Sequence, residues 1–527
     1  MAKNRQQLSS WPKGKWSQQA KEVLAERYLR KDKKGRVIET PDEMCFRVAK
    51  TMASIEKNFG VSEKEIEKIT RLFYGSFVRH DFLPNSPTLM NAGVGNDHLQ
   101  YSACFVLPVD DSLESIFDAV KKAALIHKSG GGTGFSFSRL RAQGSIVQST
   151  RGVASGPVSF MRVFDAATNE IKQGGRRRGA NIGILRVDHP DILEFIVCKE
   201  EGGITNFNLS VAATDRFMKA VLEDKDYSLI DPHTGKKAGK LKARQVFGKI
   251  VEEAWKTGDP GLFFIDRTNA GPANPVPSMG PIESTNPCGE QPLYPNESCN
   301  LGSINLVNFL KKNDFDWEAL RGVVRLAVRF LDDVVEANPY PLEEVRQATL
   351  LNRRIGLGVM GWADALFSLE IPYESQEAQK LAEKLMRFIH DEAHLESQNL
   401  AKARGPFPNF SKSIYKNGPA LRNATLTTIA PTGSISIIAG ASSGIEPAFA
   451  LAFKHKANGR ELTFVNPYFL AAAKKYRLSA KQIREVEEAG VLGEIKSLPP
   501  KLRKVFATAH EISPEGHIRM QAAFQKG

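Results

Sequence analysis

Amphipathic patterns in the first part of the chain predict helices. Three segments, at 17–29, near 42–58 and at 62–80, place apolar residues along one face of an α-helix. The turn-rich run FLPNSPTLMNAG then closes this part of the chain. We therefore expect an N-terminal helical region over residues 1–95 that caps the molecule and is not a separate catalytic unit.

From about residue 100 onward, short β-rich runs alternate with helical stretches. Strands separated by helices favour an α/β fold with parallel strands, and eight strands in one region favour a barrel over an open sheet. In such a barrel, reactive groups collect at strand ends and on connecting loops, so residues distant in sequence can converge. The eight predicted strands lie at 101–109, 134–140, 181–187, 207–213, 261–266, 298–307, 354–361 and 424–433.

Composition narrows the class of protein. The five cysteines of the 527-residue chain are too few and too scattered for a disulfide-stapled secreted protein, and they indicate a reducing cytoplasm. No signal peptide and no stretch of about 18 uninterrupted apolar residues is present, so we expect no membrane partner. The formal net charge of +13 favours anionic partners. Because the basic residues are dispersed among acids and their densest runs lack aromatics, we expect small phosphorylated ligands and no nucleic acid.

The run NPCGEQPLYPNESCNLGSINL, residues 286–306, carries the strongest candidate chemistry. Cys288 and Glu290 place a sulfur and a proton acceptor on one short loop, with Asn286 as a neutral hydrogen-bonding partner. Cys299 supplies a second sulfur. An isolated cysteine is more often a buried small hydrophobe, and these spacings, without a nearby His or CxxC pair, fit structural zinc poorly. The arrangement favours radical or redox chemistry and assigns no metal ligand.

Glycine-rich runs are candidate anion sites. APTGSISIIAGASSGIEP at 430–447 is interpreted either as a strand-to-helix turn suited to phosphate or as a plain turn. HKSGGGTGFSFSRLR at 127–141 matches no established phosphate motif, and we interpret it as a flexible loop near an anion. In GGRRRGAN at 174–181, glycines flank three arginines, which small phosphorylated ligands explain better than DNA.

Four of these segments, YSACFVLPVDDSLESI, FLPNSPTLMNAG, the 286–306 loop and APTGSISIIAGASSGIEP, closely resemble the catalytic subunit of ribonucleotide reductase in its adenosylcobalamin-dependent (class II) branch. The resemblance implies a ten-stranded-type α/β barrel, the kind shared with glycyl radical enzymes, over residues 96–527, with a finger loop near 284–297. It also implies an oxidoreductase that reduces ribonucleotides, with diphosphates expected, to 2′-deoxyribonucleotides by thiyl radical chemistry.

The resemblance assigns the catalytic residues by matching position. Cys288 resembles the cysteine that becomes a thiyl radical and takes the 3′ hydrogen, and Glu290 the base acting on the 3′ hydroxyl. Asn286 resembles the partner that holds the ribose hydroxyls. Cys104 and Cys299 match the pair that reduces the 2′ carbon and ends as a disulfide.

Binding and regulatory residues follow from the same resemblance. The substrate phosphates are expected at Ser86, Thr88, Thr432, Gly433 and Ser434. A deoxynucleotide or ATP effector is expected at Asp111, Lys128 and Arg141, and the loop that reports the effector to the substrate base holds Lys172, Gln173 and Arg177. Base choice would then be a reciprocal coupling between two sites.

The expected partners include a second copy of the chain and an external dithiol. The chain ends at HIRMQAAFQKG, where relatives continue through two more strands and a cysteine-bearing tail, so we expect the C-terminal strands to be missing and a dithiol to reach the site directly. Two alternatives stay open. The chain is an N-terminal fragment that binds nucleotide and needs a complementing C-terminal chain, or it takes its radical from a separate metal subunit.

Overall fold

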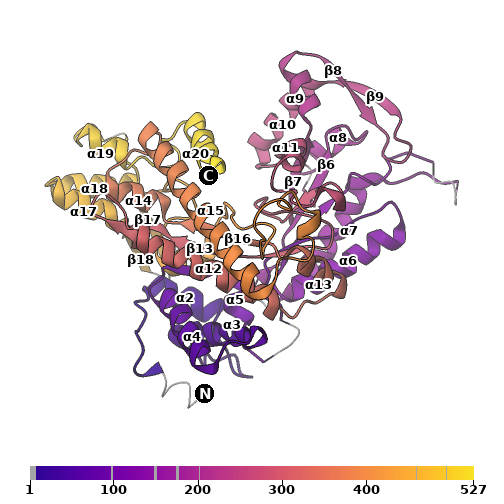
Figure 1. Cartoon of the computed structure of the whole chain (residues 1–527). Helices are drawn as coiled ribbons and strands as arrows, with labels where there is room; N and C mark the ends of the chain where they lie inside the picture. The colour runs from indigo at the N-terminus through magenta and orange to yellow at the C-terminus, as the bar shows by residue number, and fades with distance from the viewer. Residues whose placement is uncertain are drawn as a thin grey trace.

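The structure is a computed structural model of the chain. It describes residues 8–95, 99–146, 151–173, 177–200, 202–457, 460–493 and 495–527. The N-terminal helices lie at one end of the molecule, the C-terminal helices α17–α20 flank one side, and the β8–β9 hairpin stands at the end farthest from the N-terminus (Figure 1).

The N-terminal part is helical, as its amphipathic pattern predicts. It consists of α2 (Gln18–Arg27), α3 (Pro41–Ala53), α4 (Glu63–Val78) and α5 (Ser86–Asn91). Local sequence sets the helix starts: Thr40 and Glu43 form a capping box before α3, and Ser62 caps α4. The apolar faces of these helices join one large core with α12 (Trp317–Ala337), α15 (Gln376–Arg404) and the strands β13 and β16.

An eight-stranded mixed sheet forms the centre of the molecule, in the order β1-β13-β2-β3-β6-β7-β10, with β16 also paired to β13. The strands β2, β3, β6, β7 and β10 run parallel to one another. β13 is parallel to β16 but antiparallel to β1 and β2. The predicted α/β fold with an incomplete barrel is confirmed, and the expectation of parallel strands fails where β13 meets β1 and β2.

Seven of the eight predicted strands are present. They are β2 (Cys104–Val106), β3 (Gly132–Ser136), β6 (Asn181–Arg186), β7 (Phe207–Ala213), β10 (Gly261–Phe264), β13 (Ser298–Asn305) and β16 (Ile355–Met360). The run 424–433 is not a strand, although it hydrogen-bonds to β16 and forms an isolated bridge between Thr427 and Leu357. The eighth strand of the sheet is instead β1 (Phe82–Pro84), inside the run that was predicted as turns.

Two layers of side chains cover the sheet. One face packs against α6 (Leu113–Lys128), α7 (Gly156–Glu170), α9 (Asp215–Leu222) and α10 (Ala243–Thr257). Alternate strand residues such as Ile182 and Ile184 face the other side, where they meet residues 276–294 and 407–424. This second face therefore holds the segment with the candidate cysteine loop.

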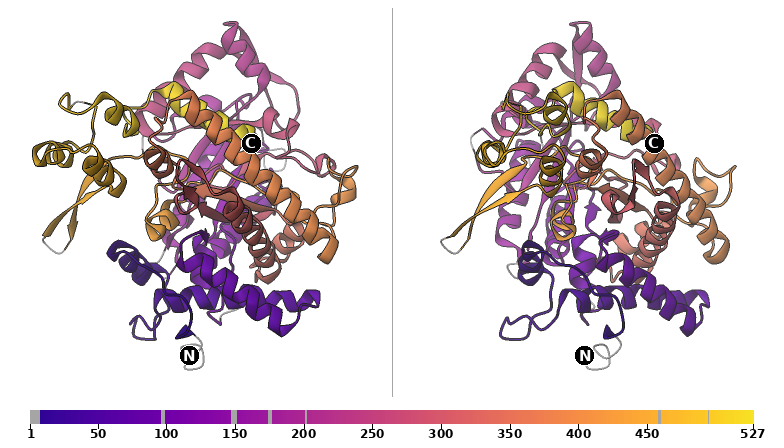
Figure 2. Two further views of the ribbon diagram at one scale, coloured as in Figure 1. Left: turned by 60° about the vertical axis from the view of Figure 1, so that its left-hand side comes forward. Right: turned by 90° about the vertical axis from the view of Figure 1, so that its left-hand side faces the viewer.

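The remaining elements lie around this frame. The β17–β18 hairpin projects from the body in both views of Figure 2. The elements are β4 (Lys172–Gln173), β5 (Arg177–Arg178), α8 (Ile192–Val197), β8 (Asp226–Ile230), β9 (Lys237–Lys242), α11 (Ile265–Ala270), β11 (Ser284–Thr285), β12 (Pro292–Leu293), β14 (Leu310–Lys311), β15 (Asp314–Phe315), α13 (Glu343–Asn352), α14 (Trp362–Leu369), α16 (Gly433–Ala439), β17 (Ala452–Ala457), β18 (Arg460–Val465), α17 (Pro467–Lys475), α18 (Ala480–Ala489), α19 (Pro500–Val505) and α20 (Pro514–Lys526).

A buried ion cluster fastens α12 to the chain around β16. Asp332 is fully buried and pairs with Arg353 (2.9 Å), Arg404 (2.8 Å) and Arg422 (3.3 Å). Although burial raises the pKa of Asp332, the three arginines together hold it well below its usual value. A lowered folded-state pKa means that the stabilisation is present in full at neutral pH and is lost only as strong acid protonates the carboxylate.

We expect Asp332→Asn to lower the free energy of unfolding by about 3–5 kcal/mol, because it leaves three arginines facing a neutral amide. The urea unfolding midpoint at neutral pH measures this loss. Glu67→Gln, which breaks an exposed pair with Arg71 at 3.0 Å, is the matched control. It should change the free energy by less than about 1 kcal/mol, and equal losses in both variants would contradict the special role of the buried cluster.

Candidate functional site

Cys104 and Cys299 face each other on neighbouring strands. They are direct partners in the antiparallel register of β2 and β13. Such partners have Cβ atoms about 4.5–5.5 Å apart, a spacing that a disulfide can bridge with little movement. Both thiols are buried and neither forms a disulfide, and both belong to one apolar cluster with Val106, Leu293, Leu301 and Ala430. The fold thus stores two adjacent thiols that can be oxidised together.

The surroundings of Cys299 keep it a thiol. Its Sγ donates to the carbonyl oxygens of Asn300 (3.4 Å) and Arg354 (3.7 Å). Burial raises the pKa of Cys299 far above its usual value, against the opposing pull of the Arg354 charge. At neutral pH, Cys299 therefore carries its hydrogen.

Cys288 lies at the turn of a short hairpin formed by β11 and β12, with Thr285 opposite Pro292. Asn286, Pro287, Cys288 and Gly289 form a β-turn closed by the hydrogen bond from Gly289 N–H to Asn286 O (3.0 Å). Asn at the first position, Pro at the second and Gly at the fourth are the residues that favour this turn. Cys288 is exposed, unlike the other four cysteines. We call residues 284–293 the finger hairpin.

Asn286 connects the finger hairpin to the cysteine pair. Its Nδ2 donates to Cys104 Sγ (3.1 Å), and its Oδ1 accepts from the backbone N–H of Gln291 (2.9 Å). The side chain is buried. An amide offers two hydrogens and two lone pairs, so one of each is left for a ligand beside the cysteines. Asn286 both fixes the turn and faces the predicted reaction site.

Glu290 lies on the returning side of the turn. Its backbone oxygen accepts from Thr428 Oγ1 (3.1 Å), and its charge contributes to the raised pKa of Cys299, so the carboxylate lies near that thiol. The segment after Thr428 passes Ala430, which packs in the cysteine cluster, and reaches Thr432. One extended segment thus connects Glu290 and the cysteines to the start of α16.

The predicted phosphate-binding residues lie around α16. Thr432 has a left-handed backbone (φ 53°), and its Oγ1 accepts from Gly444 N–H at 2.7 Å. Gly433 is exposed and Ser434 half-buried. Ser86 hydrogen-bonds to the Tyr28 hydroxyl (2.8 Å) at the end of α2, which packs against α16. Thr88, by contrast, is fully buried, and its hydroxyl is engaged by Asn85 and Tyr101.

The predicted effector residues separate into two places. Arg141 Nε and Asp111 Oδ2 form an ion pair of 2.8 Å at the start of α6, with His233 of the β8–β9 turn 3.8 Å from the same carboxylate. Lys128 is the last residue of the 16-residue α6, which places it about 22 Å from the first residue at 1.5 Å per residue. Within one chain, the structure brings Asp111 and Arg141 together and leaves Lys128 at the opposite end of the helix.

The predicted specificity loop includes two short antiparallel strands of two residues each. Gln173 of β4 is paired with Arg177 of β5, and Lys172 with Arg178. The backbone of β4 lies against α6. The side chains of Lys172, Gln173 and Arg177, and residues 174–176 as a whole, lie outside the described part of the structure.

Two glycines of GGGTG, Gly132 and Gly134, make room for the finger hairpin, and they belong to strand β3 where a flexible loop was expected. Gly132 and Gly134 lie on the buried strand β3. A Cβ on Gly134 would sit 1.6 Å from the carbonyl oxygen of Thr285, and one on Gly132 would sit 2.8 Å from Pro287 Cγ. The hairpin lies this close to β3 because both residues lack a side chain.

Two buried residues beside the cysteines were missed in the sequence. Glu297 and Arg354 form an ion pair of 2.9 Å in which both side chains are almost fully buried. The signal was present, since Arg353 and Arg354 stand directly before the apolar run of β16, where charged residues are unusual unless they are paired.

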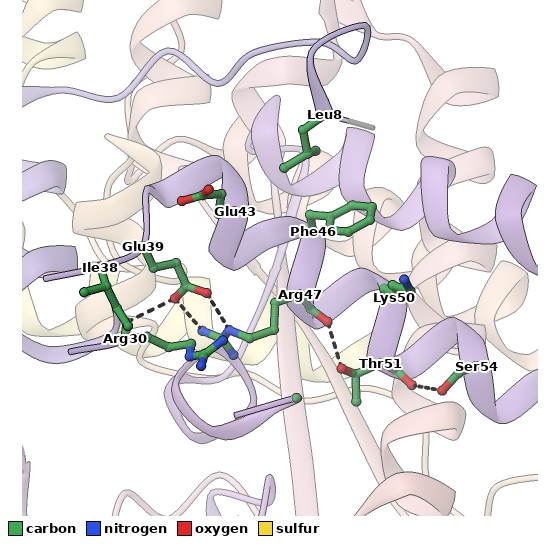
Figure 3. Close-up of a pocket in the computed structure, with 11 residues that line it drawn as sticks. Leu8, Arg30, Ile38, Glu39, Glu43, Phe46, Arg47, Lys50, Thr51 and Ser54 are labelled. Atoms are coloured by element: carbon green, nitrogen blue, oxygen red, sulfur yellow. Dashed lines mark hydrogen bonds and ion pairs between the residues drawn. The ribbon is translucent and has the colours of Figure 1, made fainter. Parts of the chain in front are cut away.

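A pocket of about 390 Å³ lies in the N-terminal region (Figure 3). Its eleven lining residues include none of the predicted site residues. The buried ion pair of Arg47 with Glu39 (2.8 Å) forms part of its wall. In the described residues, no helix is both long enough and apolar enough to span a membrane.

Comparisons with known proteins identify relatives along nearly the whole chain. Residues 15–97 match the family model "Ribonucleotide reductase, all-alpha domain", and residues 102–421 and 418–527 match "Ribonucleotide reductase, barrel domain". The vitamin B12-dependent ribonucleoside-diphosphate reductase of Thermoplasma acidophilum is 49% identical over 96% of this chain and 73% of its own length. The enzyme of the same name from Mycobacterium tuberculosis is 47% identical over 96% of this chain and 72% of its own.

A solved structure has the same fold. The class Id ribonucleotide reductase alpha subunit of Actinobacillus ureae superposes with a TM-score of 0.78 over 97% of this chain and 89% of that one. The two sequences are 24% identical, so this likeness speaks for the architecture alone.

Proposed function

Because the chain belongs to the ribonucleotide reductase family, we propose that it reduces ribonucleoside diphosphates to 2′-deoxyribonucleoside diphosphates with adenosylcobalamin as cofactor. The resemblance drawn from four short motifs is confirmed by the two family models and by the relatives named for vitamin B12. The proposed substrate and cofactor follow the names of those relatives.

The observation that carries the proposal is the pairing of Cys104 with Cys299, with the Asn286 amide 3.1 Å from one of the two sulfurs. Replacing a C–OH group by C–H consumes two electrons and two hydrogens and releases water. Two thiols supply both as they become one disulfide, and the register of β2 and β13 allows that bond. A third thiol is then needed to start the reaction, and Cys288 is on the hairpin that Asn286 joins to this pair.

The position of Cys288 fits a bulky external radical source. Its side chain is exposed at the tip of the finger hairpin, whereas the reducing pair is buried. When bound, adenosylcobalamin supplies the one-electron chemistry that takes a hydrogen atom from a thiol. We propose that Cys288 gives up this hydrogen and then removes the 3′ hydrogen of the ribose. Cys104 and Cys299 are buried, so the radical source does not reach their hydrogens.

Glu290 and Asn286 are proposed to act on the ribose hydroxyls. Glu290 is the acid nearest Cys288 in sequence and lies close enough to Cys299 to influence its thiol, so one carboxylate can serve the side of the sugar that faces both sulfurs. Asn286 has one hydrogen and one lone pair left to orient a hydroxyl.

The substrate phosphates are proposed to lie beside Thr432, Gly433 and Ser434, with Ser86. The exposed backbone of Gly433 and the half-buried Ser434 continue the segment that passes the cysteines. Ser86 belongs to the same neighbourhood through Tyr28. Thr88 is proposed to support this wall from within, since its hydroxyl is engaged by the protein.

We propose that effectors bind at a dimer interface along α6. Leu113 and Phe117 lie one turn apart on this helix and are 60% and 52% exposed, an apolar stripe that a second copy of the chain would cover. The Asp111–Arg141 pair lies beside the stripe. Two antiparallel copies of α6 would bring Lys128 of one chain toward this pair on the other, and the loop of Lys172, Gln173 and Arg177 would report the effector to the substrate.

Arg141→Ala should weaken binding of a deoxynucleoside triphosphate about tenfold or more, because the variant loses a charged donor worth about 1.5–3 kcal/mol. Equilibrium dialysis with labelled effector measures this. Lys128→Ala should weaken binding similarly only if the dimer places both residues at one site, and Lys121→Ala is the control on the same helix. Unchanged affinity in Arg141→Ala would contradict the assignment.

The proposed reductant is a dithiol from outside the chain, and the proposed location is the cytoplasm. Each turnover leaves Cys104 and Cys299 as a disulfide, so the next turnover requires thiol–disulfide exchange. A reducing compartment supplies that dithiol, and none of the five cysteines forms a disulfide in the structure.

The test is an assay of the purified chain with a ribonucleoside diphosphate, dithiothreitol, a deoxynucleoside triphosphate and adenosylcobalamin. The expected result is a deoxyribonucleoside diphosphate whose formation requires the cobalamin. Product that forms without cobalamin and only with a separate metal-containing subunit would overturn the cofactor. Product that forms only after a separate C-terminal chain is added would establish the alternative in which this chain binds nucleotide and needs a complementing chain.

A further inference from the structure

The ion pair of Glu297 and Arg354 lies where the finger hairpin returns into β13. Glu297 Oε2 is 2.9 Å from Arg354 Nε, and both residues are at most 2% exposed. Burying a single charge is costly, whereas a paired and hydrogen-bonded one is tolerated. The chain therefore retains an energetically costly buried ion pair beside the reducing cysteines.

The pair holds the end of the finger hairpin. Glu297 accepts from the backbone N–H of Tyr294 (2.9 Å) and from the side-chain amide of Asn352. Arg354 Nη1 donates to the carbonyl oxygens of Ala273 (3.1 Å) and Pro292 (3.2 Å). The Arg354 guanidinium lies 4.9 Å from the centre of the Tyr294 ring. β12 is thereby fixed against the chain that continues into Cys299.

The same two charges bear on Cys299. The Cys299 thiol donates to the backbone oxygen of Arg354 (3.7 Å). The positive charge of the Arg354 side chain favours the thiolate form of Cys299, whereas the carboxylates of Glu297 and Glu290 disfavour it. Two further titratable groups lie near Cys299. Burial raises the pKa of Tyr340, so its hydroxyl is neutral, and Cys104 lies on the facing strand. With Glu297 in place, the charge of Arg354 is compensated within one ion pair.

We propose that Glu297 and Arg354 are positioning residues for the reduction, whose ion pair fixes the end of the finger hairpin against β13 and compensates the charge of Arg354 beside Cys299. This inference deepens the proposed function and rests on it. Reduction needs one hydrogen from each of the two thiols, and a thiolate at Cys299 would bring electrons without its hydrogen. An uncompensated Arg354 would favour that thiolate.

Glu297→Gln isolates the charge, because glutamine keeps the shape and can still accept from Tyr294 N–H. The probe is the infrared S–H stretching band of Cys299, identified by its loss in Cys299→Ser and followed from neutral to alkaline pH. The expected result is a titration midpoint about one unit or more lower than in the unmodified protein. A midpoint that does not move would overturn the proposal.

A second variant separates charge from packing. Glu297→Gln with Arg354→Met removes both charges, so the account predicts that the midpoint returns toward that of the unmodified protein. If the pair were merely structural, the double variant would deviate further than the single one. Glu336→Gln, which removes a partner of Arg353 at 2.8 Å, is the matched control and should leave the band unchanged.

The S–H measurement needs neither substrate nor cofactor, so it distinguishes failure of this inference from failure of the proposed function. Turnover supplies the second readout. Glu297→Gln should lower kcat and leave KM nearly unchanged, because the substrate still binds while the finger hairpin is held less firmly beside the reducing cysteines. A rise in KM alone would assign Glu297 to substrate binding and overturn the positioning role.

Discussion

Cys288→Ser is expected to abolish formation of the deoxynucleotide. A hydroxyl O–H bond is much stronger than a thiol S–H bond, so serine at this position cannot give up a hydrogen atom and pass a radical to the ribose. Serine otherwise resembles cysteine in size, and the residue is exposed at a turn, so the fold should be retained. We expect the loss in kcat to exceed about 10³-fold, as when the reacting side chain of other enzymes is removed.

The measurement is product formation under the full assay, together with effector affinity. Effector binding should be nearly unchanged, because the Asp111–Arg141 pair lies at the start of α6 and not on the finger hairpin. The matched control is Cys198→Ser, which replaces a buried cysteine directly after α8. This variant should retain turnover. Turnover retained in Cys288→Ser would refute the assignment of the radical to this residue.

Gly134→Ala is expected to disable the site from the neighbouring strand. The new Cβ would lie 1.6 Å from the carbonyl oxygen of Thr285, which is backbone and cannot rotate away, so the finger hairpin must move. Displacement of reacting groups by about 1 Å costs about 10²-fold in rate. Overpacking should also lower the free energy of unfolding by about 1–3 kcal/mol.

The comparison is with Gly239→Ala, a glycine of β9 whose added Cβ would make an ordinary van der Waals contact with Leu229 Cδ1 at 3.7 Å. That variant should keep full turnover. Steady-state kcat and urea unfolding of both variants check the prediction. Full activity in Gly134→Ala would show that the close approach of hairpin and strand does not position the chemistry.

Much of the fold could be predicted because its strands are short apolar runs bounded by turns and separated by helices. β1 could not, since it has three residues, ends at Pro84 and lies within a turn-rich run; its place is set by pairing with β13. The run 424–433 has the composition of a strand, yet it contributes one isolated bridge and then reaches Pro431. Tertiary pairing decided both cases.

The candidate site was accessible to sequence reasoning through its unusual residues. The Asn-Pro-Cys-Gly turn follows from local preferences, and the motifs together led to the family. The register that sets Cys104 opposite Cys299 could not be derived, because the two residues are far apart in sequence and nothing local specifies their alignment. The role of Gly134 was equally hidden, since a glycine that makes room looks like one that makes a loop flexible.

The central claim is tested most directly by a single turnover without external dithiol. The fully reduced chain is mixed with a ribonucleoside diphosphate, effector and adenosylcobalamin, then quenched, and its peptides are analysed by mass spectrometry. The account predicts at most one deoxynucleotide per chain, with a matching amount of disulfide between Cys104 and Cys299. Product accompanied by reduced Cys104 and Cys299, or by a disulfide that joins other cysteines, would contradict it.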